Sequence, residues 1–328
     1  MIRSVQVFLR FSCLVVWLCQ LATPHLSAQT QRSDSEPSSE EHQGRINFQR
    51  LQLTDQYFCD GVNSGDIDGD GDEDLVAGPY WYEGPDFQVS HAFYEPVALV
   101  PEESPSNSMF SFVEDFSGDG KLDILVLGRV HKHEAAWYEN PGTLDGLWKR
   151  HFAFHRVKGE SPDLVDLDGD GVRQLICHWN GSWGSIQPDA EDPFSPWVFT
   201  PIEEPKDWPQ FYHGQGVGDV NGDGLTDLVI NDGWYEQPRA TSGASDKPIF
   251  WTYHPGKFSK ARGGAQIYLQ DVDGDGDQDV LTAIDAHGWG LAWFEQHTDP
   301  ASPQFREHLI MGDRSQMDQY GVAFTQPH

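Results

Sequence analysis

One nine-residue pattern recurs five times along this chain of 328 residues. Every copy has aspartate at its first and fifth positions and glycine at its fourth and sixth. The copies are DIDGDGDED from Asp66, DFSGDGKLD from Asp115, DLDGDGVRQ from Asp166, DVNGDGLTD from Asp219 and DVDGDGDQD from Asp271. Successive copies start 49, 51, 53 and 52 residues apart. A nearly fixed period of this size restricts the fold to a solenoid, a propeller or an array of small repeats.

The residues around each copy predict strands. A short β-favouring run follows each loop at once, as in Ile124–Leu127 and Leu228–Ile230, and an aromatic segment such as Trp81–Glu83 comes further on. No segment between the loops has the periodicity of an amphipathic helix. Four short strands per repeat are typical of a propeller blade. We therefore predict an all-β fold, a β-propeller of four-stranded blades, over residues 46–328.

The length of this region predicts five blades plus a partial one. A sixth loop is due near residue 323, but the chain reads YGVAFTQPH over 320–328. Gly321-Val322 matches Gly61-Val62, which precedes the first loop by five residues. The expectation is therefore a C-terminally truncated chain. Its unpaired last strand should promote association between copies.

The loop pattern also has a chemical interpretation. Side-chain oxygens at positions 1, 3, 5 and 9, with a backbone carbonyl at position 7, can converge on one hard cation. The glycines permit the tight backbone that such wrapping needs. An EF-hand is excluded, because it requires Glu at position 12 and flanking helices, whereas position 12 is Ala77 in the first loop and Thr282 in the last. The alternative is a set of Asx-type turns that need no metal.

This combination resembles the FG-GAP or VCBS repeat of integrin α-chain-type propellers, and in detail the secreted bacterial type. Ala77-Gly78-Pro79 is similar to the strand ending that gives the repeat its name. The resemblance implies a complete propeller of seven blades, of which this chain would hold five and a part. It also implies about five Ca²⁺ sites, and Gln174 should make the third the weakest. The implied ligands are Asp66, Asp68, Asp70, Asp74, Asp115, Ser117, Asp119, Asp123, Asp166, Asp168, Asp170, Gln174, Asp219, Asn221, Asp223, Asp227, Asp271, Asp273, Asp275 and Asp279.

The charge balance excludes several classes of partner. Lys and Arg number 21 and Asp and Glu 52, for a net charge of −31. Such a surface repels phosphate backbones and anionic lipids, so we expect no nucleic-acid partner. Two cysteines, Cys59 and Cys177, lie outside the N-terminal segment, in blades that are not neighbours, so no disulfide is expected.

The N-terminal residues predict export. Residues 1–28 combine Arg3 and Arg10, an apolar run and a small residue at Ala28, as in a secretory signal peptide. Residues 29–45 contain no aliphatic or aromatic side chain and predict a disordered polar leader. The mature protein is thus expected to be secreted, periplasmic or at the cell surface, without membrane insertion after signal removal.

The face opposite the loops is the predicted ligand face. His131, His133 and His287 fall in hairpins on that side, and Trp208, Tyr212 and His213 precede the first strand of the fourth blade. His131 and His133 could share a strand face and hold a transition metal. The alternative is that they are ordinary loop histidines. The recurrent Trp-Tyr-Glu segments are interpreted as packing between blades, not as a carbohydrate site.

Two functional hypotheses follow. The first is a binding or adhesion module for an extracellular carbohydrate or protein, with no catalytic residue assigned. The second is an extracellular sugar-processing enzyme similar to polysaccharide lyases or aldos-2-ulose dehydratase, because some of these use calcium-bearing propellers. Convergence of His213, His287 and an acidic residue within a few ångströms would favour the enzyme, and a scattered arrangement would favour the binding module.

Overall fold

The structure is a computed structural model. It describes residues 49–129, 132–144, 146–189, 191–239, 248–260, 263–264, 266–297 and 304–312. The predicted signal peptide and leader, His131 and the segment 320–328 lie outside these residues. The described residues form twenty β-strands and no helix, so they include no helix long and apolar enough to cross a membrane.

The strands form five antiparallel sheets of four, and each sheet corresponds to one sequence repeat. In every sheet the strands pair in chain order, joined by hairpins. The first sheet is β1 (Val62–Gly65), β2 (Asp74–Ala77), β3 (Tyr80–Tyr82) and β4 (Ser90–Ala92), and the second is β5 (Ser108–Glu114), β6 (Asp123–Gly128), β7 (Glu134–Glu139) and β8 (Lys149–Phe154). The third is β9 (Lys158–Val165), β10 (Gln174–Trp179), β11 (Ser182–Gln187) and β12 (Val198–Pro201), and the fourth is β13 (Gln215–Gly218), β14 (Asp227–Ile230), β15 (Gly233–Glu236) and β16 (Thr252–Pro255). The fifth is β17 (Ile267–Gln270), β18 (Asp279–Ala283), β19 (Leu291–His297) and β20 (Gln304–Met311).

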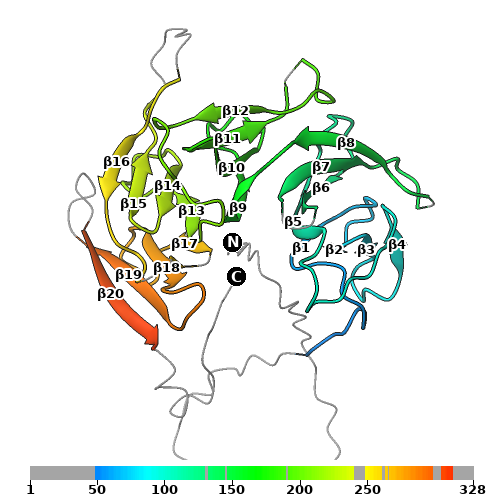
Figure 1. Cartoon of the computed structure of the whole chain (residues 1–328), viewed down its shortest axis with the longest axis horizontal. Helices are drawn as coiled ribbons and strands as arrows, with labels where there is room; N and C mark the ends of the chain where they lie inside the picture. The colour runs from blue at the N-terminus through cyan, green and yellow to red at the C-terminus, as the bar shows by residue number, and fades with distance from the viewer. Residues whose placement is uncertain are drawn as a thin grey trace, which may run out of the picture.

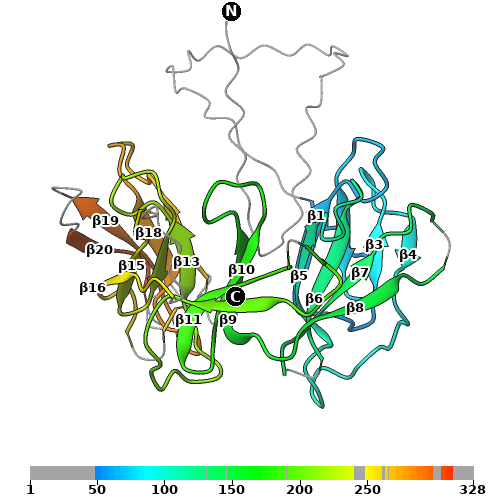
Figure 2. The same ribbon diagram turned by 90° about the horizontal axis from the view of Figure 1, so that it is seen from above.

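The five sheets lie side by side in an arc (Figure 1). The first strand of each sheet lies on the inner side of the arc and the fourth strand on the outer side. Viewed from above, the sheet β9–β12 occupies the middle of the arc (Figure 2). Within the described residues no strand pairing joins the first sheet to the last. The all-β prediction and its four-stranded repeats are confirmed, whereas ring closure and a partial sixth blade stay predictions.

Neighbouring sheets are held together by four apolar clusters, one at each junction. Consecutive residues of a central strand serve different junctions, because side chains alternate between the faces of a sheet. Ile124 packs toward the first sheet and Leu125 toward the third. In the same way, Leu228 packs toward the third sheet and Val229 toward the fifth. Burial on both faces explains why an unbroken apolar run follows each loop.

The aromatic segments belong to this packing, as the sequence predicted. Trp234 is buried at the junction between the fourth and fifth sheets, and Tyr235 at the junction between the third and fourth. Trp137 is fully buried between the second and third sheets. A buried aromatic ring of this size contributes several kcal/mol of burial free energy, about 3–5 kcal/mol on truncation to alanine. The rings therefore fix one sheet against the next.

A histidine on the outer strand covers four of these tryptophans, which sequence reasoning missed. The ring pairs Trp81–His91, Trp137–His151, Trp234–His254 and Trp293–His308 stack with centroids 4.5, 4.2, 4.2 and 4.5 Å apart. In each pair the histidine Nε2 also lies within hydrogen-bond distance of the glutamate two residues after the tryptophan. We call these units the Trp–His–Glu stacks. They attach the fourth strand of the sheet to the third.

Candidate functional site

Antiparallel connection in chain order separates the loops into two groups. The hairpins from first to second strand lie at one end of each sheet, and all five acidic loops are in these hairpins. The hairpins from second to third strand, and the connections between sheets, lie at the other end. We call the first end the acidic face and the second the histidine face.

Each acidic loop wraps around its first aspartate. In the first loop the backbone N–H groups of Gly69 and Gly71 donate to Asp66 Oδ1 and Oδ2, at 2.9 and 3.1 Å. Both glycines have positive φ, 79° and 99°, which an L side chain rarely adopts. The same donors recur around Asp166 and Asp271. The glycines of the repeat are thus required for the shape of the loop.

The ninth position joins the loop to the backbone at or just after the end of the third strand of its sheet. Asp74 Oδ2 accepts the N–H of Ile67, and its Oδ1 accepts the N–H of Gly84, both at 2.8 Å. Asp227 and Asp279 accept equivalent pairs of backbone donors. Burial nevertheless raises the pKa of Asp123 to about 6 and that of Asp227 to about 7. Buried carboxylates of this kind fit a bound cation, whose charge would offset the cost of ionising them.

Three loops bring three carboxylates together, with one oxygen of each within 4.8 Å of the others. These groups are Asp66, Asp68 and Asp70; Asp166, Asp168 and Asp170; and Asp271, Asp273 and Asp279. Their oxygen donors and separations fit a hard divalent cation such as Ca²⁺. The loops could therefore hold a metal, and an Asx-turn network already shapes them without one.

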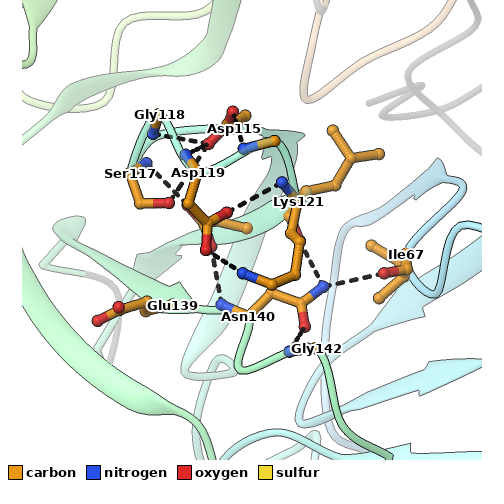
Figure 3. A network of polar contacts seen from close by, with 12 residues as sticks. Ile67, Asp115, Ser117, Gly118, Asp119, Lys121, Glu139, Asn140 and Gly142 are labelled. Atoms are coloured by element: carbon orange, nitrogen blue, oxygen red, sulfur yellow. Dashed lines mark hydrogen bonds and ion pairs between the residues drawn. The ribbon is translucent and has the colours of Figure 1, made fainter.

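The second and fourth loops differ from these three. Their third position is neutral, Ser117 or Asn221, and a basic side chain reaches the fifth-position aspartate. Lys121 Nζ pairs with Asp119 (Figure 3), and an Arg239 nitrogen lies 3.6 Å from Asp223 Oδ2. These two loops thus carry less uncompensated negative charge than the first and fifth loops, which contain six and five acidic residues.

The third loop differs at its ninth position. Gln174 Oε1 accepts the N–H of Leu167 at 2.8 Å, so one backbone contact of the missing aspartate is kept. Its Nε2 donates to the carbonyl of Val172 at 2.7 Å. That carbonyl is the position-7 oxygen assigned above as a cation ligand, and the amide competes for it.

Amide side chains connect the acidic loops of neighbouring sheets. Asn140 Nδ2 donates to the carbonyl of Ile67 in the first loop at 2.9 Å, while the Asn140 N–H donates to Asp123 of the second loop at 2.7 Å (Figure 3). Gln237 makes the corresponding links to Leu167 and Asp227. A single side chain therefore links the acidic loops of two neighbouring sheets.

On the histidine face, the structure brings three of the predicted ligand-face residues to one cavity. Tyr212, His213 and His287 line it together with Glu160 and Lys260, and its volume is about 630 Å³. Trp208 packs instead against Trp183 and Tyr212 and donates its indole N–H to Glu203. Sequence reasoning missed Glu160, because it belongs to β9 and only the topology brings it beside the fourth sheet.

His133 has a different role from the one predicted with His131. It lies in the β6–β7 turn with φ of 53°, not on a strand, so the shared strand face is wrong for this residue. Its Nδ1 is 3.0 Å from the Val157 carbonyl, and its ring packs edge-on against Phe110 and Phe211. Its partner in that hypothesis, His131, lies outside the described residues.

The cavity contains a close group of titratable side chains. His213 Nε2 lies 2.9 Å from His287 Nε2 and 3.1 Å from Glu160 Oε2. The side chains of His213 and Glu160 are buried, at 5% and 8% exposed, whereas His287 is exposed at the mouth of the group. It draws on three sheets: Glu160 is in β9, His213 precedes β13, and His287 is in the β18–β19 turn. His213 thus lies within a few ångströms of both His287 and an acidic residue, the arrangement expected to favour an enzyme.

A second carboxylate on β9 was also missed. Asp163 accepts two contacts from Gln266 Nε2, at 2.7 and 2.9 Å, which join the third sheet to the segment before β17. Burial raises the pKa of Asp163 to about 7.

Comparison with known proteins identifies one repeat within this arrangement. A family model described as an FG-GAP-like repeat matches residues 115–177, which run from the second acidic loop to the strand after the third. No curated protein matches the chain significantly. The matched segment is short compared with the whole chain, and it shows the repeat, not the role of the protein.

Three solved structures are similar at low identity. An Agrocybe aegerita lectin that recognises non-reducing terminal N-acetylglucosamine has 16% identity and a TM-score of 0.48, covering 80% of this chain and 68% of that one. The V. cholerae biofilm matrix protein Bap1 has 16% identity and a TM-score of 0.34, covering 62% and 38%. The Photorhabdus luminescens Tc holotoxin pore has 18% identity and a TM-score of 0.38, covering 80% and 12%. Similarity at this level identifies no function for this chain.

Proposed function

We propose that this chain is a secreted, calcium-stabilised β-propeller that acts as a binding or adhesion module for an extracellular carbohydrate or protein. The N-terminal sequence supports export, and the repeated acidic loops support calcium. The ligand would bind on the histidine face, where the loops differ from sheet to sheet. The acidic face would stabilise the scaffold that holds them.

The observation that carries this proposal is the cavity at Glu160, Tyr212 and His213. Its volume of about 630 Å³ is within the usual range for small-molecule sites. A cavity of this size suits a short sugar segment as ligand better than it suits the flat surface of a protein partner. Phe211 and Tyr212 offer aromatic rings, while Asp232 and Lys260 offer polar contacts. Aromatic faces combined with a few fixed polar groups are what recognition of a sugar requires.

A glycan-array screen of the calcium-loaded protein tests this function. We expect binding to a limited set of glycans, which Phe211→Ala weakens. Phe194→Ala is the matched control, because Phe194 is 45% exposed against 43% for Phe211 and lies in the β11–β12 connection at the acidic face. Equal binding by both variants would place the ligand elsewhere, and no glycan binding at all would count against a carbohydrate ligand.

A second candidate is favoured by the group at His213. An extracellular sugar-processing enzyme needs an acid and a base close together, and Glu160, His213 and His287 provide both. Glu160 would orient His213, and His213 would in turn orient the exposed His287, which would exchange a proton with the sugar. Incubation with acidic and neutral polysaccharides should release unsaturated products, and Glu160→Gln should slow their formation strongly. Turnover that His213→Ala leaves unchanged would exclude this site as the catalyst.

A further inference from the structure

A second cavity lies on the histidine face, between the first and second sheets. Its volume is about 570 Å³. It is lined by the β2–β3 turn at Pro79, by the connection from β4 to β5 at Tyr94, and by residues of β7 and β8. The apolar cluster of this junction borders it, because Val126 and Tyr138 belong to both. This cavity shares no lining residue with the cavity at His213.

Two arginines meet at one carboxylate on the wall of this second cavity. Arg129 Nη1 donates to both oxygens of Glu134, at 2.8 and 2.9 Å, and Arg150 Nη2 donates to Oε1 of the same carboxylate at 2.5 Å. Arg129 directly follows β6, Glu134 begins β7 and Arg150 is in β8. The pairing of these three strands therefore brings the side chains together.

Both arginines are accessible in this arrangement. The side chain of Arg129 is 68% exposed and that of Arg150 is 42% exposed. Each guanidinium has five N–H donors, whereas one carboxylate offers about four acceptor positions. Glu134 alone therefore cannot use all the donors of the two groups. A second carboxylate could bind them from the cavity, in the planar, bidentate geometry that guanidinium favours.

Fold stability alone does not explain why the two arginines meet here, because exposed ion pairs contribute little to it. Arg129 also has φ of 40°, a left-handed conformation that is uncommon for residues other than glycine. Its backbone N–H donates to the carbonyl of Asn107 at 3.3 Å, which holds the turn in this shape. Backbone strain of this kind is concentrated at functional sites. The strained turn thus places a cationic side chain at the cavity.

The charge of the chain restricts which anion fits the cavity. The net charge is −31, and Glu95 lines the cavity from the side of the first sheet. Both disfavour a ligand with several negative charges. A single carboxylate on a molecule that otherwise carries hydroxyl groups would meet the two arginines with the least repulsion. Tyr94 and Tyr138 offer aromatic rings and phenol groups to the rest of such a molecule.

We propose that this cavity binds a saccharide with a single uronate residue, and that Arg129 and Arg150 hold its carboxylate. The hydroxyl groups of the sugar would contact Glu95 and the two tyrosines. This inference goes beyond the proposed function, because it concerns a separate cavity and a charged class of ligand. The histidine face would then have two different sites, one at the first junction between sheets and one at His213.

Calorimetric titration of the calcium-saturated chain with a disaccharide that contains one glucuronate residue tests the proposal. We expect the acid to bind at least roughly tenfold more tightly than its methyl ester, which has the same shape without the charge. Arg129→Gln and Arg150→Gln should each weaken binding of the acid roughly tenfold. Glu95→Gln should strengthen it roughly twofold or more, because a repelling charge is removed. Arg306→Gln, at an exposed arginine of β20, is the control and should bind like the parent chain.

Calcium-loaded melting curves of each variant establish that it is folded before its binding is compared. Equal binding of the acid and the methyl ester by the parent chain, or binding of neither, would overturn the proposal. Binding that both folded arginine variants retain would overturn it equally. Loss of acid binding in Phe211→Ala alone would place the uronate in the cavity at His213, which overturns this inference and supports the proposed function. Acid binding that depends on the arginines, in a chain whose glycan binding does not depend on Phe211, would support this inference alone.

Discussion

The acidic face and the histidine face of this molecule are built on opposite principles. On the acidic face one loop design is repeated in all five sheets, with the same glycines and the same first aspartate. On the histidine face the group at His213 draws on three sheets, and it is not repeated at another junction of the described residues. Repetition suits a structural role, since every sheet needs the same closure between its first two strands. A unique group suits recognition or chemistry, and the two faces should respond differently to chelation, pH and substitution.

Chelation of calcium should have the largest effect, and it should act through the acidic face. EDTA should lower the melting temperature markedly, and excess Ca²⁺ but not Mg²⁺ should restore it. One site held at tenfold over its Kd adds about 1.4 kcal/mol, so several sites together approach the net stability of a typical domain. Differential scanning calorimetry measures this, with His287→Ala expected to show the same calcium dependence. An unchanged melting temperature after complete chelation would show that the acidic face does not stabilise the fold through bound calcium.

The next effect concerns Asp163, on the inner strand β9 between the faces. Because burial raises its pKa to about 7, above the ordinary value of 3.8, the folded state retains a proton that the unfolded chain has lost. Its contribution to stability is therefore greatest below pH 4 and declines as the pH rises to about 7. Asp163→Asn should remove this decline. The free energy of unfolding of the variant relative to the parent should therefore rise by roughly 1–3 kcal/mol between pH 4 and pH 8. Urea unfolding at both pH values would show it, and parallel pH profiles of variant and parent would contradict it.

The third loop offers a sharper test within the acidic face. Gln174→Asp restores the ninth-position carboxylate and removes the amide that occupies the Val172 carbonyl. Calcium should bind more tightly there, with a gain in stability of about 1 kcal/mol in calcium. Calorimetric titration of variant and parent measures the change. The conservative variant Gln174→Glu, whose carboxylate is one methylene further along, is the matched control. No tighter binding by the aspartate variant would argue against the ligand assignment.

The smallest effect lies in the Trp–His–Glu stacks. The hydrogen bond from His151, followed by weaker contributions from Lys149, lowers the pKa of Glu139 below its ordinary 4.5. This pair therefore stabilises the fold above about pH 4.5, and the gain is lost as the pH falls through the lowered value. Since Glu139 is 30% exposed, solvent limits the gain to about 1 kcal/mol or less. Glu139→Gln should flatten the acid side of the stability profile, whereas Glu191→Gln, at an exposed position, should not.

The same contrast explains which parts of this structure could be predicted from the sequence. Repeat spacing and the apolar runs at Ile124–Leu127 and Leu228–Ile230 were enough to predict the strands and the packing between sheets, because each signal is local and recurs. The histidines of the stacks escaped notice because they follow their tryptophans by 10, 14, 20 and 15 residues, as the hairpins between third and fourth strands differ in length. Glu160 escaped because its proximity to His213 depends on how two sheets meet. No spacing along the chain encodes that contact.

Calcium content tests the central claim, a division of labour between the two faces, most directly. Equilibrium dialysis against Ca²⁺, followed by metal analysis, should be carried out on the parent chain and on a His213→Ala, His287→Ala double variant. We predict about five Ca²⁺ per chain in both, one for each acidic loop, with the weakest in the loop that holds Gln174. A chain that binds no calcium, or a calcium content that falls when the histidines are removed, would contradict the account.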